Sequence, residues 1–299
     1  MRYMLNIISL FVTVCVIGCG SSDSTTASST SVSQPPQQES LKSIVDKIVK
    51  QSNTAGVTLY VGTTNESWSI ASGAVKWHGE AIQTDDSLRI ASMTKLIVAT
   101  GLLLLQQEGK VNLDDYITNY IKPSLINKIE NYQTITVRQL LAMTSGIPDY
   151  SDQDAFIDVI DQDTNRIWQY EEAISYVYNV PQSFEPGTNW EYSNTNYVLI
   201  DAIVEGATGF TLAQELRRLI FTPLLMQSTY MEFRESSAEN GTKLSTHGYD
   251  GEENVTQIND AIGFGDGGLV STNEDLGAFM QALFAERWLL SEASLSEMM

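Results

Sequence analysis

Ser92-Met93-Thr94-Lys95 opens an apolar run that continues from Leu96 to Leu105, and this stretch decides the fold that the sequence predicts. The apolar run predicts a buried helix, because hydrophobic residues occupy nearly all of its faces. Residues three positions apart share one face of a helix, so we expect the hydroxyl of Ser92 beside the amine of Lys95. Burial favours the uncharged form of a lysine, which has a lone pair that can accept a proton. The pattern therefore indicates a nucleophile next to a possible base.

A Ser-x-x-Lys match is weak evidence by itself, because a chain of this length gives on the order of one such match by chance. The ordinary alternative is a first-turn serine followed by a lysine whose ammonium reaches solvent. Here the match is the only one in the chain, and it follows the turn-like stretch Gln83-Thr84-Asp85-Asp86-Ser87. A catalytic interpretation needs further parts of a site.

The first 39 residues are not expected to belong to the folded domain. Residues 1–18 combine Arg2 with an apolar stretch that is short for a membrane span, and are interpreted as a lipoprotein signal peptide. Val16-Ile17-Gly18-Cys19 looks like a bacterial lipobox, in which the thiol of Cys19 receives lipid; an ordinary signal peptide with an incidental cysteine is the alternative. Residues 19–39 are rich in Ser, Thr, Gln and Pro and predict a flexible tether. We expect an exported bacterial lipoprotein on the periplasmic side of a membrane, with the outer membrane favoured.

Charge and cysteine content exclude several kinds of partner and site. The chain has 17 Lys and Arg against 37 Asp and Glu, a net charge of −20, and such a surface repels nucleic acid and anionic lipid headgroups. Membrane attachment would then depend on lipid carried by Cys19. The other cysteine, Cys15, leaves with the signal peptide. Residues 40–299 therefore contain no thiol for a disulfide, a cysteine nucleophile or a thiolate metal site.

Residues 40–299 are expected to form one domain that starts with a helix and a hairpin. Apolar residues at helical spacing predict an amphipathic helix over residues 40–51. Residues 56–61 and 68–73 predict the two strands of the hairpin, since both are β-like runs bounded by turn residues.

Helix signals dominate the rest of the domain. The helix that Ser92 opens closes at Gly109, residues 136–143 predict another, and capping boxes at residues 211–214 and 271–274 open two more. Two strands make a poor sheet. We therefore expect the strands that belong beside the hairpin to lie beyond Met299.

A second candidate site element is Tyr192-Ser193-Asn194, which follows the turn signal Pro186-Gly187. Ser193 or Asn194 can cap the helix predicted after it, so that Tyr192 projects from the end of a loop. A tyrosine acts as a base only where cations stabilise its phenolate, and Lys95 can supply one such charge. In the alternative interpretation Tyr192 packs in the core and Asn194 is only a helix cap.

Five segments occur in one order along the chain and together identify it with a known family. The segments are Leu88-Arg89-Ile90-Ala91-Ser92-Met93-Thr94-Lys95, Gln107-Glu108-Gly109-Lys110-Val111-Asn112-Leu113-Asp114-Asp115-Tyr116, Leu140-Leu141-Ala142-Met143-Thr144-Ser145-Gly146-Ile147-Pro148-Asp149-Tyr150, Tyr192-Ser193-Asn194 and Gly267-Gly268-Leu269-Val270-Ser271-Thr272. This array resembles the class C β-lactamase and penicillin-binding serine hydrolase family, which includes D-alanyl-D-alanine carboxypeptidases and promiscuous esterases. The resemblance covers roughly residues 40–299.

The resemblance implies an α+β fold of the β-lactamase/transpeptidase type, with an antiparallel sheet flanked by helices and a large helical subdomain. It also implies acyl transfer through a covalent serine ester. Ser92 would be the nucleophile, Lys95 would help to deprotonate it, and Tyr192 would act as general base and then as acid toward the leaving group. Asn194 would orient the substrate amide, and the backbone N–H of Ser92 would form half of an oxyanion hole. No cofactor or metal is expected.

Two positions depart from the family pattern. Met143 stands where many relatives carry histidine, which we take as tolerable because the family's catalysis does not use that position. The family's third motif, Lys-Thr-Gly or His-x-Gly, supplies a cation beside the tyrosine and a backbone N–H for the oxyanion hole, and no match to it follows Ser271-Thr272. We therefore expect a chain truncated before the third motif, with the C-terminal strands missing and the site incomplete.

Other hydrolytic mechanisms find less support in the sequence. A Ser-His-Asp hydrolase is the nearest rival, but the chain has no Gly-x-Ser-x-Gly motif. His78 and His247 are expected at the surface and form no metal-ligand cluster, which argues against zinc hydrolysis. The remaining acidic pairs are typical of solvated turns and helix starts and receive no catalytic role; they are Asp85-Asp86, Asp114-Asp115 and Glu171-Glu172.

A hypothesis from another class is a lipid-anchored, catalytically inactive binding protein that keeps the fold. The missing third motif favours it, whereas Ser92, Lys95 and Tyr192 oppose it. In the enzyme interpretation the substrate is a small molecule or a peptidoglycan peptide: a β-lactam, a D-Ala-D-Ala peptide or a carboxylic ester, because pocket shape selects among them. We expect peptidase-like or esterase activity ahead of β-lactamase activity.

Overall fold

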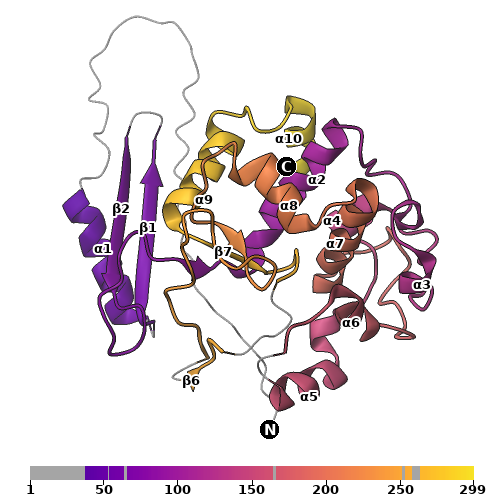
Figure 1. Cartoon of the computed structure of the whole chain (residues 1–299), viewed down its shortest axis with the longest axis horizontal. Helices are drawn as coiled ribbons and strands as arrows, with labels where there is room; N and C mark the ends of the chain where they lie inside the picture. Colours follow the sequence, from indigo (N-terminus) through magenta and orange to yellow (C-terminus); the bar gives the residue numbers. More distant parts are fainter. Residues whose placement is uncertain (1–37, 53, 64–65, 164–165, 251–252, 258–262) are drawn as a thin grey trace, which may run out of the picture.

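The computed structural model describes residues 38–299 apart from residues 53, 64–65, 164–165, 251–252 and 258–262. The predicted signal peptide, Cys19 and the predicted tether up to residue 37 lie outside the described residues. Figure 1 shows a hairpin and its helix at one end of the molecule and most of the helices at the other. The first helix begins at Gln38, within the last two residues of the predicted tether.

The described elements begin with a helix and a hairpin and continue mostly as helices separated by very short strands. The strands are β1 (Gly56–Gly62), β2 (Ser67–Gly73), β3 (Leu88–Arg89), β4 (Tyr230–Met231), β5 (Tyr249–Asp250), β6 (Glu253–Asn254) and β7 (Leu269–Ser271). The α-helices are α1 (Gln38–Gln51), α2 (Thr94–Gln107), α3 (Pro123–Ile126), α4 (Val137–Leu141), α5 (Asp154–Gln162), α6 (Tyr170–Ser175), α7 (Asn194–Thr208), α8 (Leu212–Leu216), α9 (Asn273–Met280) and α10 (Glu292–Met298). Three 3₁₀ turns are η1 (Ala91–Met93), η2 (Ile117–Asn119) and η3 (Tyr150–Asp152), and two π-helical turns are η4 (Arg217–Phe221) and η5 (Gln281–Ala285).

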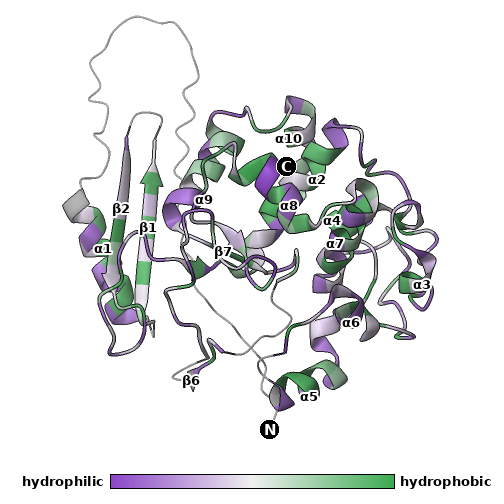
Figure 2. Ribbon diagram, viewed as in Figure 1, coloured by the Kyte–Doolittle hydropathy of each residue, from purple (hydrophilic) through white to green (hydrophobic). Residues whose placement is uncertain are grey.

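The hairpin β1-β2 is antiparallel, and both strands lie where the sequence predicts them. Leu59 and Val61 are buried and alternate with less buried neighbours along β1. Figure 2 shows hydrophobic stretches of that strand in green. Together with Ile70 of β2, Leu59 and Val61 are buried against α1. The other face of β1 meets α9, where Nδ2 of Asn273 donates a hydrogen bond of 2.8 Å to Oγ1 of Thr58. Helices therefore cover the hairpin on both faces.

The shorter strands form two further sheets. β7 lies between β3 and β4 in an antiparallel sheet, with Val270 opposite both Arg89 and Tyr230, and β5 pairs with β6. Sequence analysis did not find these strands, because two or three residues are too few to show an alternating pattern. The sheet β3-β7-β4 matters for function, since β3 leads directly into the turn that carries Ser92.

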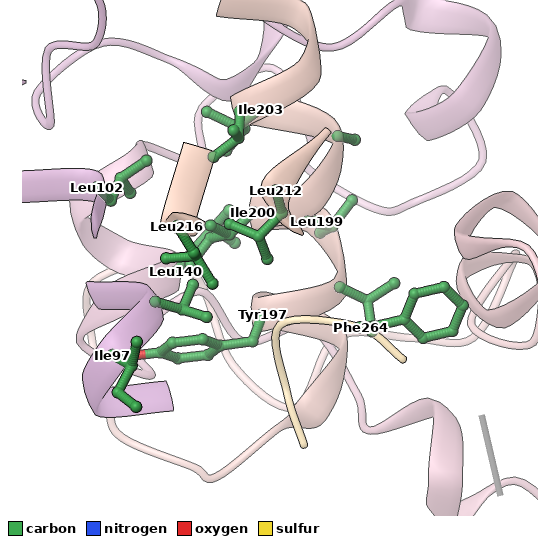
Figure 3. Packing of buried hydrophobic residues seen from close by; sticks show 14 of the residues in the cluster. Ile97, Leu102, Leu140, Tyr197, Leu199, Ile200, Ile203, Leu212, Leu216 and Phe264 are labelled. Atoms are coloured by element: carbon green, nitrogen blue, oxygen red, sulfur yellow. The ribbon is translucent and has the colours of Figure 1, made fainter. Parts of the chain in front are cut away.

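Helices α2 and α7 form the centre of the helical part. Ile97 and Leu102 of α2 belong to the same buried cluster as Leu140 of α4, Ile200 of α7 and Leu216 of α8 (Figure 3). The burial of α2 confirms the prediction made from the apolar run after Lys95. This packing explains why α2 is apolar. None of the helices in the described part of the chain is long and apolar enough to cross a membrane.

Two of the predicted helix starts are confirmed and one is wrong. Thr136 and Thr211 each form a capping box at the start of α4 and α8. Ser271 does not cap α9: it is the last residue of β7, and its Oγ lies 2.8 Å from Oγ1 of Thr229. Thr272 caps α9 instead by accepting from the backbone N–H of Asp275. The sequence allows either residue as the N-cap, because each hydroxyl is followed three residues later by an acidic residue. The pairing of Ser271 within the sheet leaves Thr272 as the cap.

Candidate active site

Ser92 lies in a sharp turn between β3 and α2. The N–H of Ile90 donates to the carbonyl of Leu269 at 3.0 Å, which extends the pairing of β3 with β7. Ala91 then adopts φ = +47°, in the left-handed region that residues with a Cβ rarely occupy. Ser92 follows in the 3₁₀ turn η1, and α2 begins at Thr94. The exposed hydroxyl is thus held by a strained turn just before the helix, whereas the sequence predicted it within the first helical turn.

The structure brings together all four side chains that the sequence singled out. Oγ of Ser92 lies 2.7 Å from the hydroxyl of Tyr192, and Nζ of Lys95 lies 3.2 Å from the same Oγ. Nζ also donates to Oδ1 of Asn194 at 2.8 Å and lies 4.9 Å from the centre of the Tyr192 ring. The contacts of Tyr192 with Ser92 and of Asn194 with Lys95 join residues about one hundred positions apart in the sequence. The arrangement has the geometry of a nucleophile between two candidate bases, and the roles of the residues stay a prediction.

The ordinary alternatives for these residues do not fit the structure. Lys95 is only 7% exposed, so its ammonium does not reach into solvent. Tyr192 is 42% exposed and therefore does not pack in the core. Ser193 occupies the N-cap position of α7, but its side chain makes no capping hydrogen bond, and Asn194 is the first residue of the helix.

Nζ of Lys95 has three hydrogen-bond partners in the structure, and two of them determine what the nitrogen presents to the third, Ser92. Nζ donates to Oδ1 of Asn194 and to the backbone carbonyl of Asp266, and these two oxygens can only accept hydrogen bonds. Both therefore take N–H groups whether the nitrogen is an ammonium or a neutral amine. The remaining position of the nitrogen faces Oγ of Ser92. In the ammonium this position carries an N–H, and in the neutral amine it carries the lone pair. A proton of Ser92 can thus pass to Lys95 without any change in the other two bonds.

Asp149 fixes the orientation of the Asn194 amide. Its Oδ2 accepts from the backbone N–H of Asn194 at 2.9 Å and from Nδ2 at 3.0 Å. Because a carboxylate cannot donate, Nδ2 must face Asp149 and Oδ1 must face Lys95. The other carboxylate oxygen accepts from the N–H and hydroxyl of Ser151. Sequence analysis quoted Asp149 within a motif but gave it no role, since nothing in the sequence relates it to a residue 45 positions away.

The loop before Asp149 holds the start of α7 by further polar contacts. Ser145 donates from its hydroxyl to Oδ1 of Asn196 at 2.6 Å, and both side chains are buried. Nδ2 of the same amide donates to the thioether sulfur of Met143 at 3.2 Å. Thr195 donates from its hydroxyl to the carbonyl of Pro148 at 2.7 Å. Met143, which departs from the family pattern, therefore takes part in holding α7 and lies outside the contacts of Ser92.

A second tyrosine near Lys95 is not suited to act as the base. The ring centre of Tyr197 lies 5.6 Å from Nζ of Lys95. Burial, together with the neighbouring Tyr192, raises the pKa of Tyr197 to about 12, so its hydroxyl keeps its proton. Tyr192 contacts Ser92 directly and is open to solvent, and it is the better candidate for proton transfer.

The other candidate groups lie outside this site. His78 is exposed, and His247 is half-buried with its Nδ1 2.8 Å from Nδ2 of Asn254, so the expectation of a surface position holds fully only for His78. Of the acidic pairs, Asp114 binds Arg138, and Glu172 binds Arg166. Across the residues that the structure describes, no group of three or more His, Cys, Asp or Glu side chains could hold a metal ion.

A buried carboxyl group supports the segment that carries Asp266. Oδ2 of Asp201 accepts from the backbone N–H of Gly265 at 2.7 Å. Burial raises the pKa of Asp201 to about 8; the bond from Gly265 and the charge of Arg234 oppose this, and the charges of Asp266 and Glu205 reinforce it. The folded protein therefore keeps a proton that the unfolded chain releases near the ordinary value of 3.8.

We expect the free energy of unfolding to fall as the pH rises from about 4 to 8. The stability that a raised pKa contributes is fully present below the pKa of the unfolded chain, and it is lost as the pH rises through the pKa of the folded protein. The contribution of Asp201 to this slope is at most about 1.4 kcal/mol per pH unit, the value for one proton. Asp201→Asn keeps an acceptor for Gly265 and removes the titration, so its urea-unfolding curves at several pH values should show a flatter dependence. The exposed Glu274→Gln controls for the loss of one carboxylate; equal slopes for wild type and Asp201→Asn would mean that Asp201 is ionised in the folded state.

Comparison with known proteins agrees with the fold and with the order of the motifs. A family model described as Beta-lactamase matches residues 41–299. Penicillin-binding protein 4* of Bacillus subtilis (strain 168) is 30% identical over 230 residues, 71% of this chain and 48% of that protein. The chain thus spans about half the length of this relative.

Solved structures give the same picture. The D-stereospecific amidohydrolase from Streptomyces sp. superposes with a TM-score of 0.74 at 27% identity, over 88% of this chain and 77% of that one. The D-amino acid amidase from Ochrobactrum anthropi SV3, complexed with L-phenylalanine, gives a TM-score of 0.74 at 30% identity, over 87% of this chain and 72% of that one. These neighbours confirm the α+β fold of the β-lactamase/transpeptidase type. The chain belongs to the beta-lactamase family.

Proposed function

We propose that this protein is a serine hydrolase that cleaves amides or esters through a covalent acyl-enzyme. The observation that carries the proposal is the position of Oγ of Ser92, within hydrogen-bond distance of both the Tyr192 hydroxyl and Nζ of Lys95. Nucleophilic catalysis by serine needs a base at this distance. The similarity to a D-stereospecific amidohydrolase, a D-amino acid amidase and a penicillin-binding protein supports the same class of reaction.

In the proposed acylation, Oγ of Ser92 attacks the carbonyl carbon of the substrate while its proton passes to Lys95 or Tyr192. The bond from the carbonyl carbon to the leaving nitrogen or oxygen then breaks, and the Tyr192 hydroxyl donates a proton to the leaving group. In deacylation a water molecule gives a proton to Tyr192 and attacks the ester. The acid is released, and Oγ of Ser92 regains a proton from the group that accepted it in acylation, the ammonium of Lys95 or the hydroxyl of Tyr192. The backbone N–H of Ser92 would stabilise the oxyanion in both steps.

For the substrate, we favour small amides and peptides with D-amino acids, or carboxylic esters, ahead of β-lactams. The names of the similar structures refer to D-amino acid amides and D-stereospecific amide hydrolysis. Tyr192 is 42% exposed and Ser92 is exposed, so the proposed nucleophile is accessible from solvent. We further propose that lipid on Cys19 anchors the protein at the periplasmic side of a membrane; the lipobox-like sequence and the polar stretch after it support this.

Ser92→Ala should abolish covalent labelling of the protein by a fluorescent penicillin or a fluorescent fluorophosphonate, because the labelled oxygen is removed. Tyr192→Phe should slow labelling by about 10²-fold or more, since it removes one proton-transfer group. Gel fluorescence over time measures both. Ser175→Ala, which changes an exposed serine of α6, should label like the wild type. If the folded wild type forms no adduct that depends on Ser92, the protein is better explained as a catalytically inactive binding protein.

Substrate preference is tested by comparing turnover of three compounds by the wild type: a chromogenic cephalosporin, a nitrophenyl ester and a D-amino acid amide or D-Ala-D-Ala peptide. We expect the ester and the amide or peptide to be hydrolysed faster than the cephalosporin. Ser92→Ala serves as the background for each compound. Fast turnover of the cephalosporin without cleavage of the others would contradict the preference.

Asp149→Ala should lower kcat for the nitrophenyl ester by about 10- to 100-fold, because the amide of Asn194 is then free to turn its NH₂ toward Lys95. A hydrogen bond to a charged group contributes about 1.5–3 kcal/mol, which corresponds to this range. Ser151→Ala is the matched control: it removes a contact of 3.3 Å to Nδ2 of Asn194 but leaves Asp149, so we expect a smaller loss. Equal activity of Asp149→Ala and wild type would contradict the assigned role.

A further inference from the structure

The second acceptor of Lys95 is a backbone carbonyl that glycine residues make easy to displace. The carbonyl of Asp266 belongs to the peptide unit that joins it to Gly267, and Gly268 follows. Glycine has no Cβ, so the backbone on either side of it can shift at low steric cost. The N–H of Gly267 makes only a long hydrogen bond of 3.3 Å, to the carbonyl of Phe264. Something else must hold the Asp266 carbonyl toward Lys95.

The side chain of Asp266 provides such a restraint. Its Oδ2 accepts a hydrogen bond of 2.8 Å from the hydroxyl of Tyr150. Asp266 is 7% exposed and Tyr150 is 2% exposed, so the bond is shielded from water. A buried hydrogen bond to a carboxylate is shorter and stronger than one between neutral groups. With its side chain held, Asp266 cannot shift away from Lys95, and carry its carbonyl with it, without breaking this bond.

Tyr150 is itself held in place by the start of α7. Its backbone N–H donates to Oγ1 of Thr195 at 2.9 Å. Its ring meets the ring of Phe156 edge to face, with the centres 5.0 Å apart and the planes at 85°. The hydroxyl of Tyr150 therefore has a fixed position relative to α7, the helix that carries Asn194.

Two neighbouring residues thus control the two acceptors that orient Lys95. The carboxylate of Asp149 fixes Oδ1 of Asn194, and the hydroxyl of Tyr150 fixes the peptide of Asp266. We propose that Tyr150 and Asp266 are positioning residues whose hydrogen bond holds the Asp266 carbonyl against Nζ of Lys95, so that the remaining position of the nitrogen faces Ser92. This inference rests on the proposed serine hydrolase function. It adds two residues that do not touch the reacting oxygen.

The test compares the full-length wild type with Tyr150→Phe, Asp266→Ala and Asp266→Asn. The probe is hydrolysis of a nitrophenyl ester, with kcat and KM measured separately. Tyr150→Phe and Asp266→Ala should each lower kcat by about 10-fold or more with KM changed less than about 2-fold, because the amine is misdirected while substrate binding is unaffected. Asp266→Asn keeps an oxygen that can accept from Tyr150 and should retain kcat within about 3-fold.

Tyr178→Phe is the matched control for these variants. It removes another tyrosine hydroxyl that donates a hydrogen bond, to the carbonyl of Leu125, outside the site. Its kcat should stay within about 2-fold of wild type. The proposal is overturned if Tyr150→Phe keeps the wild-type kcat, or if its KM rises while kcat is retained. It is also overturned if Asp266→Asn loses as much kcat as Asp266→Ala, or if Tyr178→Phe loses as much kcat as Tyr150→Phe at a similar melting temperature.

Failure of the proposed function is recognised separately, because it appears as absence of Ser92-dependent labelling in the wild type. In that case a crystal structure of Tyr150→Phe still tests whether Tyr150 keeps the Asp266 carbonyl in contact with Nζ of Lys95. We expect Asp266 to shift in that variant, so that its carbonyl moves away from Nζ of Lys95. An unchanged Asp266 carbonyl in contact with Lys95 would overturn the proposal without any measurement of turnover.

Discussion

The burial of one lysine amine is the constraint on which the rest of this structure depends. A cation or an amine removed from water needs hydrogen-bond partners in the protein, and Lys95 finds them on three separate elements: Ser92 in the turn before α2, Asn194 at the start of α7 and Asp266 before β7. The sequence positions of these partners are far apart, so the fold has to bring three segments to one point. The packing of α2 and of α7 against α8 and the pairing of β3 with β7 achieve this.

The site is supported more firmly on one side than on the other. Asp149 and Tyr150 belong to one short segment and hold two of the partners of Lys95, whereas Tyr192 reaches Ser92 from a half-exposed position. In the proposed reaction this division is useful, because Lys95 must keep its direction while the tyrosine exchanges protons with the leaving group and with water. In this proposed reaction, the rigid side orients the nitrogen and the more exposed side admits substrate.

The sequence predicted those features that leave a local pattern. The hairpin strands are β-like runs bounded by turn residues, α2 has a continuous apolar run, and the capping box at Thr211 has hydroxyl and amide side chains at fixed spacing. The short strands and the start of α9 could not be predicted, since sheet pairing over two or three residues depends on distant segments. The meeting of Ser92, Lys95, Tyr192 and Asn194 was reached through the order of family motifs. The roles of Asp149 and Asp266 escaped because their partners are defined only in three dimensions.

The backbone of Ala91 has a consequence for how this chain can vary. A residue with φ = +47° is a poor place for a β-branched side chain, and even alanine is strained there. Few residues therefore fit at position 91. Glycine would relieve the strain but make the turn more flexible, and valine or isoleucine would disfavour the positive φ that the turn requires. The identity of this small residue governs how sharply the chain changes direction just before Ser92.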